Sequence, residues 1–216
     1  MKVIFDFDDV IFNAEGFKRA MVQVLEGSSY TDVMSTYEEY RRRDTQEQAT
    51  PFSLKDFISE VDPELAPDAV EVLYKKILGF SENLANQEVL AMIEDIGKEN
   101  CYIVTNGVKE FQMDKIRRSI GEEGFASISI VEGSKKDVIR TICEEHRDER
   151  VVFIDDKQKY FDDIDRDACN NLQTVLFDSV SGVARSKDAV NEASKREGKE
   201  MMFKMVPSSE VSRLVR

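Results

Sequence analysis

Two aspartates, Asp6 and Asp8, stand at the end of the apolar run Val3–Phe7. In a β-strand, side chains two residues apart lie on the same face, so this spacing predicts that both carboxylates face one point where the strand leaves its sheet. Two such charges about 4 Å apart repel by roughly 1 to 4 kcal/mol. The pair therefore requires a cation or a shared proton, and Mg²⁺ suits an all-oxygen site that also binds phosphate. The alternative is that these acids only cap the following helix.

Two later apolar runs also end in polar residues. Val151–Ile154 is followed by Asp155-Asp156, and Tyr102–Thr105 runs into Thr105-Asn106-Gly107. In a doubly wound sheet of order 3-2-1-4-5, these two strands flank the first strand, and ligands bind at the carboxyl edge beside it. We therefore expect the three clusters to meet at one edge of the sheet.

Lys135 and Lys136 lie between the third and fourth apolar runs, near the start of an expected helix. An ammonium group at that place, together with the positive end of the helix dipole, favours a bound anion. The expected site thus combines carboxylates, a hydroxyl, an amide and a lysine.

The elements that must position these residues are short strands alternating with helices. Five apolar runs rich in β-branched and aromatic residues predict the strands, and the residues between them keep helical spacing. The runs are Val3–Phe7, Tyr102–Thr105, Ile128–Val131, Val151–Ile154 and Thr174–Phe177. This pattern predicts an α/β fold with a doubly wound, Rossmann-like parallel sheet.

The segment between the first two strands is far longer than the dozen or so residues that a crossover needs. Its apolar residues fall at helical spacing in four stretches, one of which begins at a plausible cap, Ser53, and the last of which is closed by Gly79. We therefore expect a helical cap domain over residues 15–85, inserted into a core domain formed by residues 1–14 and 86–216.

The end of the chain carries weaker patterns and no functional signal. It predicts a polar helix at Arg185–Arg196, a short strand at Met202–Val206 and a helix capped near Ser208.

Composition limits the class of protein. The 216 residues include 30 Lys and Arg against 43 Asp and Glu, giving a net charge of −13, which argues against a nucleic-acid partner. The three cysteines have no paired spacing, and no run resembles a signal peptide or approaches the roughly 20 apolar residues of a membrane span. We expect a cytoplasmic protein with reduced thiols and no membrane partner; the sequence predicts no oligomeric state.

Taken in order, these residues resemble the four motifs of the haloacid dehalogenase-like superfamily, with its helical cap between motifs one and two. Asp6-Phe7-Asp8 matches the first motif, Thr105 the second, Lys135 the third and Asp155-Asp156 the fourth. Two places depart from the family pattern. Asp9 stands where phosphatases of this family often have glycine, and Lys136 is a close rival to Lys135 because no proline follows either lysine.

The resemblance implies a phosphatase that hydrolyses a small phosphorylated metabolite. Asp6 would attack phosphorus and form an aspartyl phosphate, and Asp8 would act as acid and then base. Mg²⁺ would be held by Asp6, the Asp8 carbonyl and Asp156, with Asp155 binding directly or through water. The implied phosphate ligands are Thr105, Asn106 and Lys135.

Other functions remain open at this stage. A phosphomutase would share every motif, and a non-catalytic phosphate-binding or signalling protein is a further alternative. A dehalogenase is disfavoured, because it would lack an acid at Asp8. Arg41-Arg42-Arg43 could meet a second anionic group of the substrate, although such a run is more often a solvated face, and His146 is expected at the surface rather than as a ligand.

Overall fold

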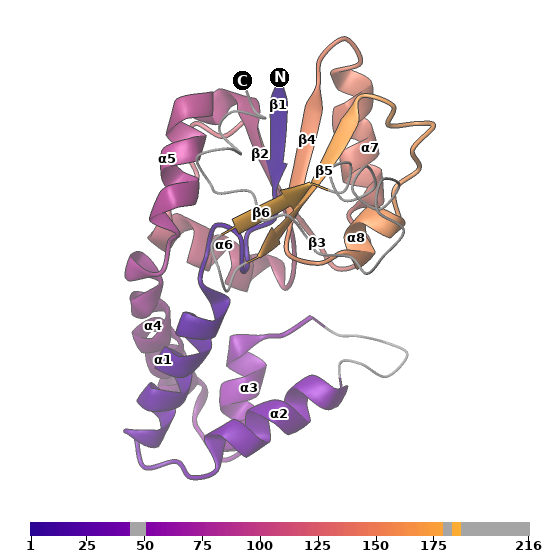
Figure 1. The fold of residues 1–216 in the computed structure, drawn as a ribbon. Helices are drawn as coiled ribbons and strands as arrows, with labels where there is room; N and C mark the ends of the chain where they lie inside the picture. The colour runs from indigo at the N-terminus through magenta and orange to yellow at the C-terminus, as the bar shows by residue number, and fades with distance from the viewer. Residues whose placement is uncertain (44–50, 179–182, 187–216) are drawn as a thin grey trace.

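The computed structural model describes residues 1–43, 51–178 and 183–186. Within them, the strands form one sheet in the order β3-β2-β1-β4-β5-β6 (Figure 1). Strands β1 to β5 are parallel, which confirms the predicted order 3-2-1-4-5, and β6 pairs antiparallel with β5. Their bounds are β1 Lys2–Phe5, β2 Cys101–Asn106, β3 Ser127–Val131, β4 Val151–Asp155, β5 Leu172–Asp178 and β6 Val183–Ser186.

Helices cover both faces of the sheet, so its central strands are apolar on both sides. In β1, Val3 and Phe5 belong to the apolar cluster on the face of α5 and α6, whereas Ile4 belongs to the cluster with α7 and α8. This alternation follows from the two-residue period of a strand. The helices are α5 Gln87–Ile96, α6 Lys109–Ser119, α7 Lys136–Glu145 and α8 Lys159–Asp162, and a short 3-10 helix, η2 Lys98–Asn100, precedes β2.

Between β1 and α5 the chain forms a helical insertion beyond the carboxyl ends of the strands (Figure 1). Its elements are α1 Ala14–Glu26, α2 Val33–Arg43, α3 Leu54–Val61, α4 Pro67–Leu78 and the 3-10 helix η1 Gly79–Asn83. Asn13 caps α1 by accepting the N–H of Gly16, and Ser53 caps α3 by accepting that of Asp56. The buried side chains of these helices join the apolar cluster on the α5 and α6 face of the sheet.

Two connecting segments lie side by side where the insertion leaves and rejoins the sheet domain. Asn13 N–H donates to the Leu84 carbonyl at 2.8 Å, and Asn86 N–H donates to the Ile11 carbonyl at 2.7 Å. Phe12 and Ala85 form an antiparallel bridge between them.

Helix α6 of the sheet domain contacts the insertion directly. Lys55 Nζ of α3 lies 2.8 Å from Glu110 Oε1, and the Tyr74 hydroxyl of α4 donates to Asp114 Oδ2 at 2.8 Å. Phe111 of α6 adds an apolar contact, because its ring centroid lies 6.4 Å from that of Tyr74. The insertion therefore rests on the helix that follows β2.

Three expectations about local structure need correction. The first strand ends at Phe5 rather than Phe7 because the chain turns immediately after it. Gly79 follows α4 with φ −56°, so the chain tightens into η1 there instead of leaving the helical conformation. Arg185 and Ser186 belong to β6, not to a polar helix, because they pair with the edge strand β5. The rest of that helix, the strand at Met202–Val206 and the helix near Ser208 lie outside the described residues.

Two expectations about the chain as a whole can be compared with the structure. Cys101, Cys143 and Cys169 are buried thiols outside any disulfide, as predicted. Among the helices described, none combines the length and the apolar character needed to cross a membrane.

Candidate active site

The turn after β1 places Asp6 inside the sheet domain. Asp6 is 3% exposed, and its N–H donates to the Ile154 carbonyl of β4 at 2.9 Å. Its Oδ1 accepts the Phe7 N–H at 2.7 Å, and the Phe7 carbonyl then accepts the N–H of Ile11. The chain has left the strand before Asp8, so strand alternation does not relate Asp6 to Asp8. Their carboxyl groups take different partners.

Asp9 has a backbone conformation that glycine adopts readily. This explains why phosphatases with the motif that the sequence resembles often have glycine at this position. Its φ is 62°, in the left-handed region where a β-carbon is strained and where Asp and Asn are tolerated better than most residues. Burial and the carboxylates of Asp156 and Asp8 raise its pKa above the ordinary value. Asp9 thus keeps the turn but adds a negative charge next to the acids.

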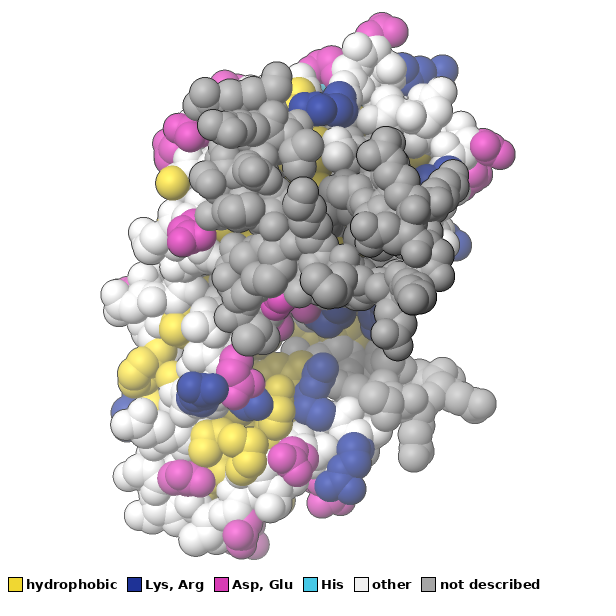
Figure 2. Space-filling model, viewed as in Figure 1, with side chains coloured by type: hydrophobic (Ala, Val, Ile, Leu, Met, Phe, Trp, Pro, Cys, Tyr) yellow, Lys and Arg dark blue, Asp and Glu magenta, His cyan; other side chains and the backbone are white. Residues whose placement is uncertain are grey.

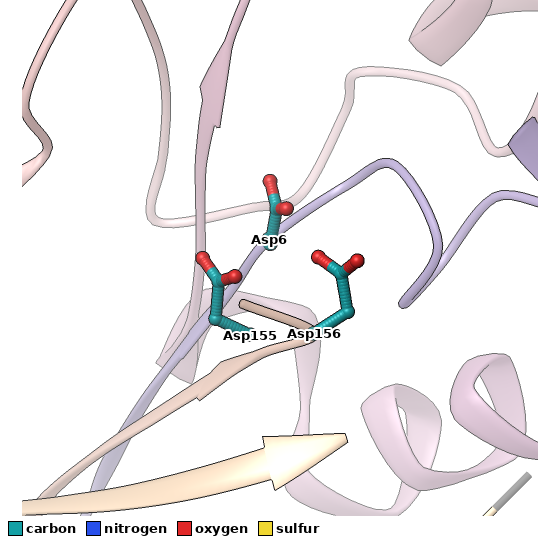
Figure 3. A group of neighbouring side chains, drawn as sticks. All are labelled: Asp6, Asp155 and Asp156. Atoms are coloured by element: carbon teal, nitrogen blue, oxygen red, sulfur yellow. The ribbon is translucent and has the colours of Figure 1, made fainter. Parts of the chain in front are cut away.

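Three carboxylates converge where β1 and β4 end (Figure 3). Asp6, Asp155 and Asp156 each offer an oxygen, and these oxygens lie within 4.8 Å of one another. Asp155 is the last residue of β4 and is fully buried, whereas Asp156 is partly exposed. A group of oxygens this close fits a hard cation such as Mg²⁺, which neutralises their repulsion.

Lys135 is the buried cation that the chain supplies to this group. Only 1% of the residue is exposed, and its Nζ lies 2.9 Å from Asp6 Oδ1 and 2.6 Å from Asp155 Oδ2. The ion pairs with both acids overcome the opposing effect of burial and raise the pKa of Lys135. Lys136, its rival in the sequence, is exposed.

Lys135 and Lys157 together do not balance the three acids. Burial and the neighbouring Asp6 carboxylate raise the pKa of Asp155 to about 7, although Lys135 acts in the opposite direction. Burial also raises the pKa of Asp156, against the effect of Lys157, whose Nζ lies 3.3 Å from it. Without a bound cation, this group therefore binds a proton near neutral pH.

The carboxylate of Asp8 lies outside the group of three acids and is held by helix α6. Lys115 Nζ lies 2.5 Å from Asp8 Oδ1, and Gln112 Nε2 donates to Asp8 Oδ2 at 2.8 Å. Burial alone would raise the pKa of Asp8, but the Lys115 ammonium and the Gln112 amide hold it below its ordinary value. Asp6 and Asp8 are thus each paired with a different buried lysine.

Sequence reasoning missed Lys115 and Gln112. Lys115 is 4% exposed, and its ammonium lies 4.9 to 5.5 Å from the ring centroids of three phenylalanines. The available signal was their position on α6, because both residues fall on the buried stripe that also holds Phe111 and Ile116. Polar residues on the buried stripe of a helix require partners, and Asp8 supplies them.

The end of β2 brings Thr105 and Asn106 to the same edge of the sheet, and the loop after β2 begins at Gly107. Thr105 is 1% exposed, and Asn106 donates from Nδ2 to the Gly133 carbonyl in the loop before Lys135. Gly107 has φ 149°, and a β-carbon there would lie 2.6 Å from the Gln112 side chain. The close approach of α6 to this loop therefore requires glycine.

Comparison with known proteins was informative only at the level of structure. No family model matches the sequence, and no curated protein matches it. Solved structures do match. A haloacid dehalogenase-like hydrolase from Burkholderia xenovorans has a TM-score of 0.61 at 16% identity, over 81% of this chain and 80% of that one. The chain has the haloacid dehalogenase-like fold.

Two further proteins of this fold match over nearly their whole length. The hydrolase YfnB from Bacillus subtilis, solved with bound magnesium, has a TM-score of 0.54 at 16% identity and aligns over 100% of this chain and 98% of that one. An L-2-haloacid dehalogenase has a TM-score of 0.53 at 11% identity, over 100% and 99% of the two chains. The fold alone therefore does not separate phosphate chemistry from dehalogenation.

In this haloacid dehalogenase-like fold, a cavity of about 450 Å³ lies between the helical insertion and the carboxyl edge of the sheet. Asp8, Asn106 and Gly107 line it on the side of the sheet, and α1 and α2 line it on the other side. Of the predicted arginine run, Arg41 lines this cavity. His146 lies apart from it, with Nε2 2.7 Å from the Tyr102 hydroxyl, and is half-buried rather than fully at the surface.

Proposed function

We propose that the protein is a Mg²⁺-dependent phosphatase that hydrolyses a small phosphorylated metabolite through an aspartyl phosphate on Asp6. The observation that carries this proposal is the group of Asp6, Asp155 and Asp156, with the buried Lys135 joined to two of its members. Such a concentration of buried carboxylates is stable only with a cation or protons, and it lies where the fold binds ligands.

The residues present fit Mg²⁺, because every donor that they offer is a carboxylate oxygen. Asp155 already accepts Lys135 on Oδ2 and the Lys157 N–H on Oδ1, at 2.6 Å and 2.8 Å. We therefore assign direct coordination to Asp6 and Asp156, with the carbonyl of Asp8 as a further ligand, and a supporting role to Asp155. When bound, the ion would neutralise phosphoryl oxygens and the charge that develops during displacement. The magnesium in the Bacillus protein of the same fold supports this choice.

Asp6 is prepared as a nucleophile by its hydrogen bonding. The Phe7 N–H and the Lys135 ammonium both engage Oδ1, so we assign Oδ2 as the attacking oxygen. Attack forms the bond from Oδ2 to phosphorus and breaks the bond from phosphorus to the ester oxygen. A water molecule then attacks the phosphoaspartate, releases phosphate and regenerates Asp6. Lys135 restrains Asp6 throughout and, with Thr105 and Asn106, binds phosphoryl oxygens.

Asp8 carries the proton in both half-reactions. A dianionic phosphate beside it would raise its pKa by like-charge repulsion and would favour a protonated carboxyl in the complex. This carboxyl gives its proton to the departing ester oxygen and later takes one from the attacking water. Lys115 and Gln112 keep the Asp8 carboxylate oriented between the two steps.

The same residues argue against dehalogenation. A halide leaves as an anion and needs no proton, so a dehalogenase has no use for the acid at Asp8. Attack on carbon also does not require three clustered carboxylates to be neutralised by a metal.

Product analysis tests the proposal against its rivals. The protein is incubated with an aryl phosphate, a sugar phosphate and L-2-chloropropionate, each with Mg²⁺ and with a chelator. We expect inorganic phosphate from the aryl phosphate in the presence of Mg²⁺ only. Release of chloride, or an isomerised sugar phosphate without free phosphate, would replace the proposal with a dehalogenase or a phosphomutase.

A further inference from the structure

We propose that the substrate is a phosphate ester with a second anionic group at its other end, bound by Lys18 of α1 and Arg41 of α2. This inference rests on the proposed function and adds the class of substrate to it.

The cavity between the insertion and the sheet has one end at the proposed phosphate site and the other at the insertion. Asn106 and Gly107 line the first end, and Lys18 and Arg41 are contributed by helices of the insertion. A volume of about 450 Å³ is that of a pocket for a small molecule. A ligand with its phosphate at Asp6 therefore extends its remaining part toward α1 and α2.

The cationic lining of this cavity contrasts with the charge of the chain. Among the described residues, five Lys and Arg line it against three acids, whereas the whole sequence has a net charge of −13. Two of these cations form ion pairs with acids at the carboxyl edge of the sheet: Lys115 pairs with Asp8, and Lys157 pairs with Asp156. The positive charges of Lys18 and Arg41, on the side of the insertion, do not neutralise the catalytic acids. They are suited to bind a second anionic group of the substrate.

Lys18 is placed to exchange its present partner for a ligand. Its Nζ lies 2.6 Å from Glu15 Oε2, in a pair three residues apart on α1 with side chains 26% and 51% exposed. Such pairs on an exposed helix surface contribute little stability, so a carboxylate or phosphate of a ligand can replace Glu15. Arg41 adds a planar group that binds such anions through two parallel hydrogen bonds.

Apolar and aromatic side chains also line the cavity, among them Phe17, Tyr37 and Phe52. Lys18 Nζ also lies 5.8 Å from the ring centroid of Tyr37, so the cation and the aromatic wall are adjacent. In Figure 2, Lys and Arg side chains lie on both sides of the hollow between the insertion and the sheet domain.

A matched series of substrates tests the inference. Alkyl phosphates of increasing chain length are compared in pairs whose far end is a carboxylate or the neutral carboxamide, together with the corresponding alkane bisphosphates. At the best length we expect kcat/KM to be at least about tenfold higher for the anion than for the amide. The net charge of the protein alone would favour the amide. Comparison of kcat/KM between the carboxylate and bisphosphate substrates shows which second anion is preferred.

Charge-removing variants locate the preference. Lys18→Gln and Arg41→Gln should each lower the anion-to-amide ratio by at least about fivefold, and added salt should lower the ratio for the unaltered protein. Lys76→Gln is the matched control, because Lys76 is exposed on α4 and does not line the cavity. It should keep the ratio of the unaltered protein.

Binding of hydrolysis-resistant phosphonates, measured by calorimetry with Mg²⁺, separates this inference from the proposed function. Turnover without a preference for the second anion would overturn the inference and leave the phosphatase proposal standing. The protein could instead show no turnover and still bind the carboxylated phosphonate at least about tenfold more tightly than its amide. That result would contradict the phosphatase proposal alone. Equal binding of the two phosphonates would also overturn the inference.

Discussion

The ammonium of Lys115 lies 2.5 Å from Asp8 Oδ1 in a setting enclosed by the rings of Phe7, Phe12 and Phe111. A buried ion pair of this kind is costly to disrupt, because removing one partner leaves the other charge without compensation. The same helix contacts the insertion through Glu110 and Asp114. Helix α6 therefore links the position of the insertion to the carboxyl group that we assign as acid and base.

Replacement of Lys115 by Met should lower kcat by at least about tenfold, since Asp8 loses its orienting partner. Lys115 holds the pKa of Asp8 low, and Asp8 must be protonated to donate to the leaving group, so the basic limb of the kcat/KM profile should move to higher pH in this variant. Lys115→Arg should recover part of kcat. Lys109→Met is the control, because Lys109 is an exposed residue of the same helix. An unshifted basic limb would show that Lys115 has only a structural role.

Stability should depend on Mg²⁺ and pH together. The pKa of Asp155 is raised to about 7 in the folded protein, so between about pH 4 and pH 7 the folded state binds more protons than the unfolded state. The metal-free protein should therefore lose stability as pH rises through this window. Mg²⁺ replaces the protons and should restore it.

Thermal unfolding with and without Mg²⁺ measures this linkage. We expect Mg²⁺ to raise Tm more at about pH 8 than at about pH 5.5, because fewer protons compete for the carboxylates at the higher pH. Asp156→Asn should reduce the increase at about pH 8. An equal increase in Tm at the two pH values would mean that the raised pKa of Asp155 is not linked to the metal.

The left-handed backbone conformation of Asp9 predicts that a glycine variant is more stable than an alanine variant, which is the reverse of their usual order of stability. Asp9→Gly and Asp9→Ala both remove the carboxylate, and they differ only in whether φ 62° is strained. The glycine variant should be the more stable of the two by about 1 kcal/mol, although glycine ordinarily destabilises relative to alanine. Denaturant unfolding measures the difference. A more stable alanine variant would contradict the left-handed conformation of this turn.

The sheet could be predicted from sequence because its central strands are buried on both faces. Val3, Ile4 and Phe5 are fully buried, and such continuous apolar runs stand out from the helices around them. The order of strands then placed Asp6, Thr105 and Asp155 at one edge. Phe7 could not be separated from the strand by pattern, because it too is fully buried, although in a turn.

The partner of Lys115 was not predictable, although the place of Lys115 on the buried stripe of α6 was. A lysine on a helix is usually solvated, and its burial depends on an acid 107 residues away in sequence. Strand β6, which contains Arg185, could not be predicted either, because it is stabilised by pairing with β5 rather than by an apolar pattern of its own. Local patterns report local structure, whereas both of these features depend on partners brought near by the fold.

Turnover of the Asp6→Asn variant tests the central claim most directly. Asparagine keeps the size of Asp6 but cannot accept the phosphoryl group, so phosphate release from an aryl phosphate with Mg²⁺ should fall at least about 100-fold. Asp95→Asn, an exposed acid on α5, is the matched control and should keep the activity of the unaltered protein. Turnover of Asp6→Asn equal to that of the unaltered protein would contradict the assignment of Asp6 as the nucleophile.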